Sequence, residues 1–319
     1  EDMDIVKAYN VLSEEFSYGS ISTQDIVVSG KFTPEALNSS VEILSQLVEV
    51  DPDLIGILGT PQVNSQNDVA LIRIATASVV GSSQSENTVK RLRGSIVPEA
   101  FSGLESSIYV SGDHAFYADF YQMVDEFTPY VFALVLTLSF ILLMMTFRSI
   151  VIPIKAVLMN LLSVGVAYGL LVLVFQKGIG NEIFGFQQTD IIEAWIPLFL
   201  FCVVFGLSMD YHVFLLSRVK EFYNKTKDNT LAVSYGLSST ATIITGAGLI
   251  MVAVFGGFAL GEMLMMQQIG FGLLVAILLD STIIRIILVP ASMKLLGEYN
   301  WYMPKWLEWL PTVKFEAEN

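Results

Sequence analysis

The stretch that decides the fold is residues 192–221, which read IEAWIPLFLFCVVFGLSMDYHVFLLSRVKE. From Trp195 to Leu216 there are 22 mainly apolar residues, with Asp210 among them. A helix of this length crosses a hydrocarbon core of about 30 Å. An acid at such depth costs about 2.5 to 3.5 kcal/mol, so it is by default a candidate functional residue. The stretch therefore predicts a membrane span with a functional carboxylate.

The residues that surround Asp210 refine this prediction. Tyr211 follows directly and adds a hydroxyl group that can donate or accept a hydrogen bond in a proton relay. No Lys or Arg lies between residues 195 and 217 to neutralise the acid. His212 is expected at the surface or inner rim rather than in the relay. Arg218 and Lys220 follow the apolar run, as is typical of the cytoplasmic end of a span.

Composition and charge support a membrane protein with two regions in different solvents. Hydrophobic residues make up 53% of the chain and charged residues 15%, against about 25% in soluble proteins. Residues 1–128 hold 19 acidic and 6 basic side chains, net −13, whereas residues 129–319 hold 12 and 11, net −1. The acidic half argues against a nucleic-acid partner, because phosphate binding needs a basic surface.

Several other chemistries lack the residues they require. The sequence holds no GxxxxGK[ST], no GxGxxG after a strand, no HExxH and no GxSxG motif. Its two histidines and single cysteine, Cys202, offer little material for a metal site or a catalytic triad, and one cysteine allows no intrachain disulfide. We therefore expect no cofactor, no metal and no enzymatic activity.

The N-terminal region, residues 1–127, is predicted to form an α+β domain outside the cytoplasm. Alternating patterns predict strands at residues 21–30, 68–78 and 106–112, and helical patterns cover residues 33–50 and 85–101. This order is βαββ-like or βαβαβ-like, as in a ferredoxin-like fold. A further helix, from residue 113 to 127, is expected to lead directly into the membrane. The chain starts without Met, so we expect it to be part of a larger protein.

Residues 128–296 are predicted to form a transmembrane bundle of five helices, at about 129–147, 150–175, 195–217, 238–260 and 269–293. The fold class is thus a polytopic α-helical membrane protein with an N-terminal α+β domain. The proposed outer loops hold Lys177 alone, whereas the proposed cytoplasmic segments hold nine basic residues: Arg148, Lys155, Arg218, Lys220, Lys225, Lys227, Lys294, Lys305 and Lys314. This bias places the C-terminus inside the cell. Residues 297–319, with Trp301, Trp306 and Trp309, are expected to form an amphipathic cytoplasmic tail.

Three further polar residues in the spans are candidates. Asp280 lies near the middle of the fifth span and Arg285 follows five residues later. Five residues turn an α-helix through about 500°, so the two are expected on different faces and not paired with each other. Each is either part of a relay or held in a structural ion pair elsewhere. Thr245 in the fourth span is a weaker candidate, because a threonine hydroxyl commonly bonds back to its own helix.

The sequence also resembles a known family. FGLSMDYHVFLLSRVKEF (205–222) is similar to the GLxxDYxxFLLSRxxE signature of the MMPL transporters of the resistance-nodulation-division superfamily. Residues 147–176 resemble the family's eighth and ninth spans, residues 269–307 its twelfth span and tail, and KAYNVLSEEF (7–16) the start of its second porter domain. The resemblance covers nearly the whole chain. It implies the second half of a transporter built from two such halves.

By this resemblance, Asp210 and Tyr211 match the Asp-Tyr pair of the proton relay, and Asp280 and Arg285 match the DxxxxR of the last span. The expected function is proton-driven export of lipids or other hydrophobic or amphipathic molecules across the cytoplasmic membrane. The expected partners are the substrate, protons, membrane lipids and either the N-terminal half or a second copy of the chain. The alternatives are a non-transporting receptor or scaffold similar to the sterol-sensing proteins, and a protein-export accessory of the SecD/SecF type.

Overall fold

The computed structural model describes residues 11, 22–189 and 191–307, and it divides the chain into two compact units, Glu1–Val124 and Asp125–Asn319. Apart from Val11, the stretch 7–16 lies outside the described residues, as do Trp309 and Lys314 of the predicted tail.

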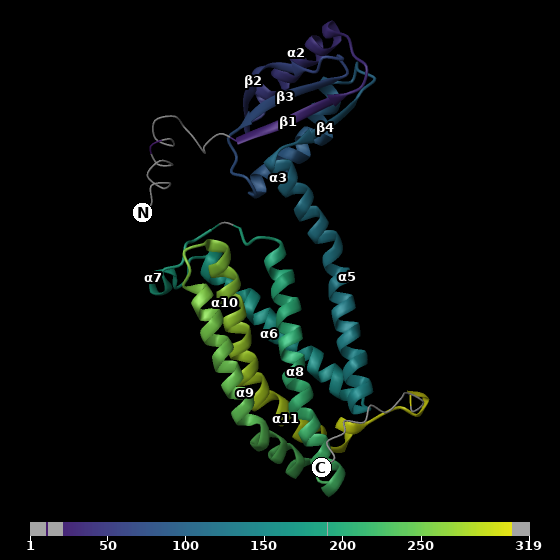
Figure 1. Ribbon diagram of the computed structural model, residues 1–319, viewed down its shortest axis with the longest axis vertical. Helices are drawn as coiled ribbons and strands as arrows, with labels where there is room; N and C mark the ends of the chain where they lie inside the picture. The colour runs from purple at the N-terminus through teal and green to yellow at the C-terminus, as the bar shows by residue number, and fades with distance from the viewer. Residues whose placement is uncertain (1–10, 12–21, 190, 308–319) are drawn as a thin grey trace. The chain divides into compact units, whose positions relative to one another are not determined.

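The first unit is a four-stranded antiparallel sheet with helices (Figure 1). In chain order its elements are β1 (Ser22–Ser29), α2 (Pro34–Val50), β2 (Leu54–Val63), β3 (Val69–Thr76), α3 (Ser83–Arg91), η1 (Leu92–Ile96), α4 (Val97–Ala100) and β4 (Ser107–Ser111). The strand order β2-β3-β1-β4 gives the βαββαβ arrangement of ferredoxin-like folds. Three of the four strands were predicted, and β2 was missed.

The core of this unit follows from the side-chain period of two along a strand. Ile26 and Val28 of β1 are fully buried, and so are Leu44 and Val48 of α2. These residues form one apolar cluster, because alternate strand residues and one helix stripe face each other. The helix α2 begins where predicted: the Thr33 side chain accepts a hydrogen bond from the backbone N–H of Ala36, and Pro34 occupies the first turn.

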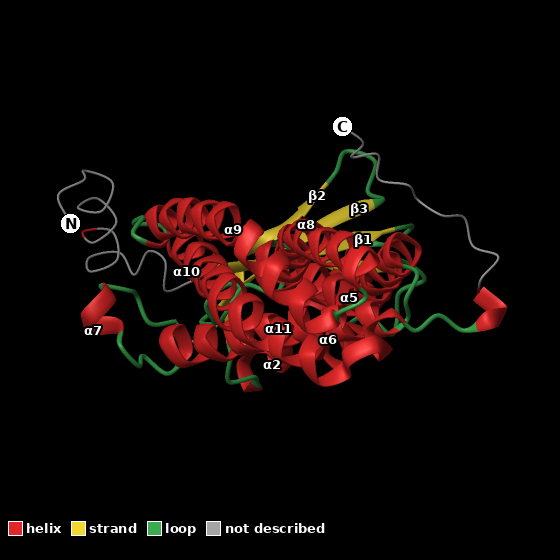
Figure 2. Ribbon diagram, turned by 90° about the horizontal axis from the view of Figure 1, so that it is seen from below, coloured by secondary structure: helices red, strands yellow, loops and turns green. Residues whose placement is uncertain are grey.

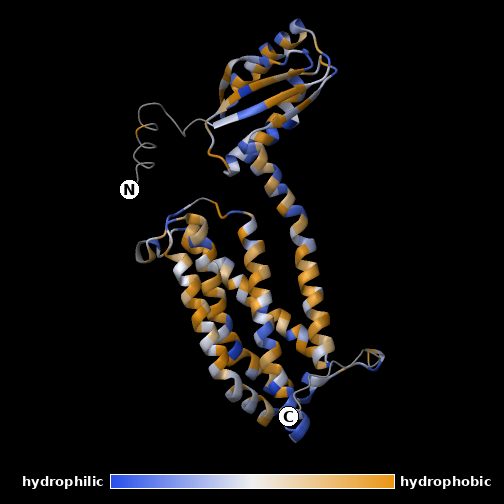
Figure 3. Ribbon diagram, viewed as in Figure 1, coloured by the Kyte–Doolittle hydropathy of each residue, from blue (hydrophilic) through white to orange (hydrophobic). Residues whose placement is uncertain are grey.

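The second unit is helical, and all the described strands belong to the first unit (Figure 2). It contains most of α5 (Asp113–Phe147), and then α6 (Val151–Leu171), η2 (Val172–Gln176), α7 (Asn181–Phe184), α8 (Trp195–Thr226), α9 (Asn229–Ala259), α10 (Leu264–Leu279), η3 (Asp280–Leu288), α11 (Val289–Leu296), η4 (Gly297–Trp301) and η5 (Lys305–Leu307). Within the described ranges, five helical stretches are long and apolar enough to cross a membrane. Their apolar residues dominate the ribbon coloured by hydropathy (Figure 3). The chain is a multi-pass membrane protein.

The helix ends and one helix type differ from the prediction. The predicted helix 113–127 and first span form one helix, α5. The fourth helix begins at Asn229 rather than 238, because the Asp228 side chain accepts a hydrogen bond from Leu231 N–H and caps it. The fifth begins at Leu264 and changes from α to π geometry at Asp280. This change determines how the candidate residues meet.

Candidate functional site

A buried polar cluster lies inside the helical unit, where α6, α8 and η3 pack together. We use this name for Asn160 of α6, Ser208 and His212 of α8, and Asp280 and Arg285 of η3. All five side chains are buried, with residue exposures of 5% or less. Charged and polar groups are rare in such surroundings and persist only when they bind one another.

The centre of the cluster is an ion pair between Asp280 and Arg285. Arg285 Nη2 lies 2.8 Å from Asp280 Oδ2. The expectation that these residues lie on different faces is wrong, because residues 280–288 form a π-helix. In a π-helix the i→i+5 hydrogen bond closes a wider turn, so residue i+5 returns to the side of residue i. The sequence spacing was right, but the assumed helix period was not.

Ser208 joins the ion pair to the neighbouring helices. Its hydroxyl donates to Asp280 Oδ1 at 3.0 Å and lies 2.8 Å from Asn160 Oδ1. Its backbone carbonyl accepts a hydrogen bond from Arg285 Nη2 at 3.0 Å. One serine therefore contacts both charges and a third helix. Through Ser208, the ion pair of η3 is linked to α6 and α8.

Tyr211 contacts the cluster, whereas Asp210 faces away from it. The Arg285 guanidinium carbon lies 4.9 Å from the centre of the Tyr211 ring, within cation–π range. Asp210 is exposed in this chain, and within the described residues its carboxylate makes no ion pair or side-chain hydrogen bond. Successive side chains on a helix point about 100° apart. Tyr211 therefore faces the buried ion pair, and Asp210 faces the outside of this unit.

Thr245 and His212 lie in different surroundings. Thr245 is exposed on α9 and is not among the contacts of the buried polar cluster. His212 is buried, with 1% exposure, so the expected surface position is wrong. It lies one helical turn after Ser208, and its Nδ1 lies 3.3 Å from the Ser208 carbonyl oxygen. The buried stripe of α8 contains Ser208 and His212, and this i, i+4 spacing could have revealed both.

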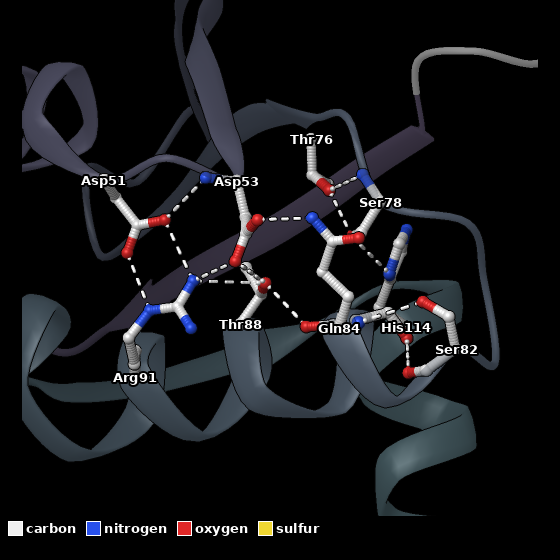
Figure 4. Close-up of polar contacts among 10 residues, drawn as sticks. Asp51, Asp53, Thr76, Ser78, Ser82, Gln84, Thr88, Arg91 and His114 are labelled. Carbon is white, nitrogen blue, oxygen red and sulfur yellow. Dashed lines mark hydrogen bonds and ion pairs between the residues drawn. The ribbon is translucent and has the colours of Figure 1, made fainter.

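A second group of polar contacts lies in the α+β unit (Figure 4). Arg91 donates from Nε to Asp51 Oδ2 at 2.8 Å and from Nη2 to Asp53 Oδ2 at 2.5 Å. Burial alone would raise the pKa of Asp51, but the hydrogen bonds from Arg91 and from the Asp53 backbone N–H, together with the Arg91 charge, hold that pKa below its ordinary value. Hydrogen bonds from Gln84 and Arg91 likewise lower the pKa of Asp53. These contacts tie the segment between α2 and β2 to α3.

Beside this group is a buried histidine that sequence reasoning did not assign. His114 is fully buried; its Nε2 contacts the Ser22 hydroxyl, and its Nδ1 lies 3.5 Å from Ser78 Oγ. Thr76 is also buried and contacts Ser78 at 2.8 Å. The group joins β1, the end of β3 and the start of α5. It has the partners of a structural core histidine.

Comparison with known proteins identifies relatives over most of the chain. The model of the MMPL family matches residues 22–309. The mycolic acid-containing lipids exporter MmpL11 of Mycolicibacterium smegmatis is 35% identical over 312 residues, which cover 96% of this chain and 32% of that protein. The trehalose monomycolate exporter MmpL3 of the same organism is 37% identical over 201 residues, covering 63% of this chain and 20% of that protein.

A third relative is named for heme uptake and not for lipid export. The heme uptake protein MmpL11 of Mycobacterium tuberculosis strain H37Rv is 41% identical over 212 residues, covering 66% of this chain and 22% of that protein. The chain thus spans a third or less of the length of these relatives. The three relatives are named for different substrates.

Proposed function

Because this chain belongs to the MMPL family, we propose that it is the second half of a transporter that uses the proton gradient to export lipids or other hydrophobic or amphipathic molecules. Two relatives named as lipid exporters support the substrate class. The complete protein requires the N-terminal half or a second copy, since this chain covers only part of those relatives.

The observation that carries the proposal is the buried Asp280–Arg285 pair in contact with Tyr211, next to the exposed Asp210. A buried ion pair is costly when one partner loses its charge, so protonation of an acid here has a structural consequence. In the proposed mechanism Asp210 and Tyr211 receive the proton, and Arg285 and Ser208 pass the change in charge to the packing of α6, α8 and η3. Each proton that moves through 100 mV releases about 2.3 kcal/mol, enough to bias such packing.

The orientation belongs to the same proposal. Residues 1–127 lie outside the cytoplasm and the C-terminus lies inside, as the distribution of Lys and Arg favours. The membrane is the cytoplasmic one, across which a proton gradient is maintained. The α+β domain then receives or releases the substrate on the outer side.

The test is gradient-dependent efflux by the full-length protein in lipid vesicles. A fluorescent phospholipid reports transport and an enclosed pH dye reports proton movement, for the wild type, for Asp210→Asn and for Glu262→Gln. Glu262 is an exposed acid in the α9–α10 turn and serves as the matched control. We expect Asp210→Asn to lose both signals and Glu262→Gln to keep them.

Two results would contradict the proposal. Intact coupling in a folded Asp210→Asn protein would remove that residue from the relay. Binding of the phospholipid without gradient-dependent transport in the wild type would favour the receptor of the sterol-sensing type.

A further inference from the structure

We infer that His212 and Lys155 form the inner part of the proton path, joined by water in a buried space between α6, α8 and η3. This inference rests on the proposed function and assigns two residues to it beyond Asp210, Tyr211, Asp280 and Arg285. Lys155 is buried, with 8% exposure, and within the described residues its ammonium group meets no carboxylate. Its ammonium group donates a long hydrogen bond to Asn300 Oδ1, at 3.5 Å.

Lys155 and His212 lie on the same side of the contact between Asn160 and Ser208. Asn160 of α6 is level with Ser208 of α8, because the two are in contact. Lys155 precedes Asn160 by five residues, about 7.5 Å along the helix, and His212 follows Ser208 by four, about 6 Å. The two helices run in opposite directions, so both steps lead the same way. Both side chains are buried.

The neighbouring contacts decide which nitrogen of the neutral His212 ring carries the hydrogen. Arg285 Nη2 carries two hydrogens, and its shortest contacts are to Asp280 Oδ2 at 2.8 Å and the Ser208 carbonyl oxygen at 3.0 Å. Both hydrogens are then in use, although His212 Nδ1 lies only 3.4 Å away. We therefore assign the hydrogen of the neutral imidazole to Nδ1, where it donates to the Ser208 carbonyl at 3.3 Å. Nε2 is left as an acceptor.

Three buried polar atoms of His212 and Arg285 have no hydrogen-bond partner among the described residues. His212 Nε2 is a buried acceptor without a donor, and Arg285 Nε and Nη1 are buried donors without an acceptor. Buried polar groups in native proteins are almost always hydrogen-bonded to protein or to water. Water satisfies donors and acceptors at once, whereas an apolar side chain satisfies neither. Lys155, on the same side of the cluster as His212, has three donors and a single long contact, to Asn300 Oδ1.

The charges around His212 allow it to pass a proton on. Arg285 Nη2 on η3 lies 3.4 Å from His212 Nδ1, Lys155 is a buried cation on α6, and Asp280 is bound to Arg285. The helix α9 holds a single titratable side chain, Tyr235, which stacks on Phe222 instead. Nε2 accepts a proton from water on the Asp280 side, and the imidazolium returns one to water on the Lys155 side. Two neighbouring cations repel the added proton, so it does not remain.

The experiment measures proton flux by the full-length protein in vesicles that enclose a pH dye, at a fixed voltage and with the inner pH set between about 6 and 8. The variants are His212→Gln, which keeps an N–H donor for Ser208, and Lys155→Met. Lys225→Met is the control, since Lys225 is exposed and near the end of α8. Thermal unfolding in detergent shows whether each variant is folded.

We expect His212→Gln to lower the flux about tenfold or more at each inner pH, as loss of a proton-transfer group does, without lowering the unfolding temperature. We expect Lys155→Met to lower the flux severalfold and Lys225→Met to leave it unchanged. A general loss of packing would lower the unfolding temperature as well, and Lys155→Met tests the path independently if His212→Gln does not fold.

Two outcomes separate this inference from the proposed function. If folded His212→Gln and Lys155→Met proteins keep wild-type flux while Asp210→Asn loses it, the inner path is wrong and the proposed function stands. If the wild type shows no gradient-driven flux, both are overturned.

Discussion

Arg285 is the residue on which the buried polar cluster depends. Its guanidinium contacts Asp280, the Ser208 carbonyl and the Tyr211 ring, and it is almost fully buried. Removing one partner of such a pair leaves an uncompensated charge in a medium of low dielectric constant. Replacing both by apolar residues removes the charges together. The two cases differ in energetic cost, which makes the pair testable.

We predict that Arg285→Met lowers the free energy of unfolding by about 3 to 5 kcal/mol, because Asp280 stays buried without its cation. Adding Asp280→Leu should recover most of that loss, although the double variant should not transport. Denaturant unfolding of the full-length protein in detergent measures both. Arg218→Met is the control, since Arg218 forms an exposed pair with Glu221 and should cost about 1 kcal/mol or less. Additive effects of the two core substitutions would show that the residues do not interact.

The Arg91 contacts predict how the α+β unit responds to acid. The pKa values of Asp51 and Asp53 are lowered from 3.8 in the folded state, so folding is stabilised above that pH and the stabilisation is lost as pH falls through the folded pKa values. We expect about 1 to 2 kcal/mol in total, at the low end of charged hydrogen bonds because Arg91 is 37% exposed.

Hydrogen exchange of peptides from β2 in the full-length protein, measured from about pH 5 to pH 3, checks this. After correction for the intrinsic effect of pH on exchange, the wild type should lose protection as pH falls. Arg91→Met should start with less protection and change less. Equal pH dependence in both would assign the acid response to other carboxylates.

At the scale of elements, the helices could be predicted from sequence better than the strands and the π-helix. Runs of about 20 apolar residues are a strong signal, and all five spans were found. The strand β2, LIGILGTPQV, contains Gly56, Gly59 and Pro61, and its pairing with β3 has register shifts. Such residues obscure the alternation that marks a strand. The Asp280–Arg285 contact was missed because a π-helix has no simple sequence signature, and the relay roles of Asp210 and Tyr211 stay predictions from burial cost and motif.

Gly270 lies where α9 and α10 approach each other closely, and this gives a prediction about packing. A Cβ atom on Gly270 would lie 2.3 Å from the Ala259 nitrogen and 2.7 Å from the Phe255 carbonyl oxygen, so α9 and α10 would have to separate. Gly257 has no atom within 4 Å of such a Cβ. We expect Gly270→Ala to cost about 3 kcal/mol of unfolding free energy and Gly257→Ala to be neutral. Equal effects in thermal unfolding would show that α9 and α10 do not pack this closely.

At the scale of the whole molecule, the position of Asp210 supports the proposal that a second half completes the transporter. The acid and Thr245 are both exposed in this chain, although they belong to helices that are apolar enough to span a membrane. A carboxylate that faced lipid would be costly, and such residues in membrane proteins face a bundle interior or a cavity. We therefore propose that the other half of the protein covers this surface.

Our last prediction concerns the orientation on which the direction of transport depends. In a Cys202→Ala background, Ser65→Cys marks the β2–β3 turn of the first unit, and Lys225→Cys marks the end of α8; both positions are exposed. A membrane-impermeant maleimide added to intact cells should label Ser65→Cys, and should label Lys225→Cys only after the membrane is opened. The physical reason is that basic residues are retained on the cytoplasmic side during insertion. The reverse pattern would place the α+β unit inside the cell, and the proton path inferred above would then run outward.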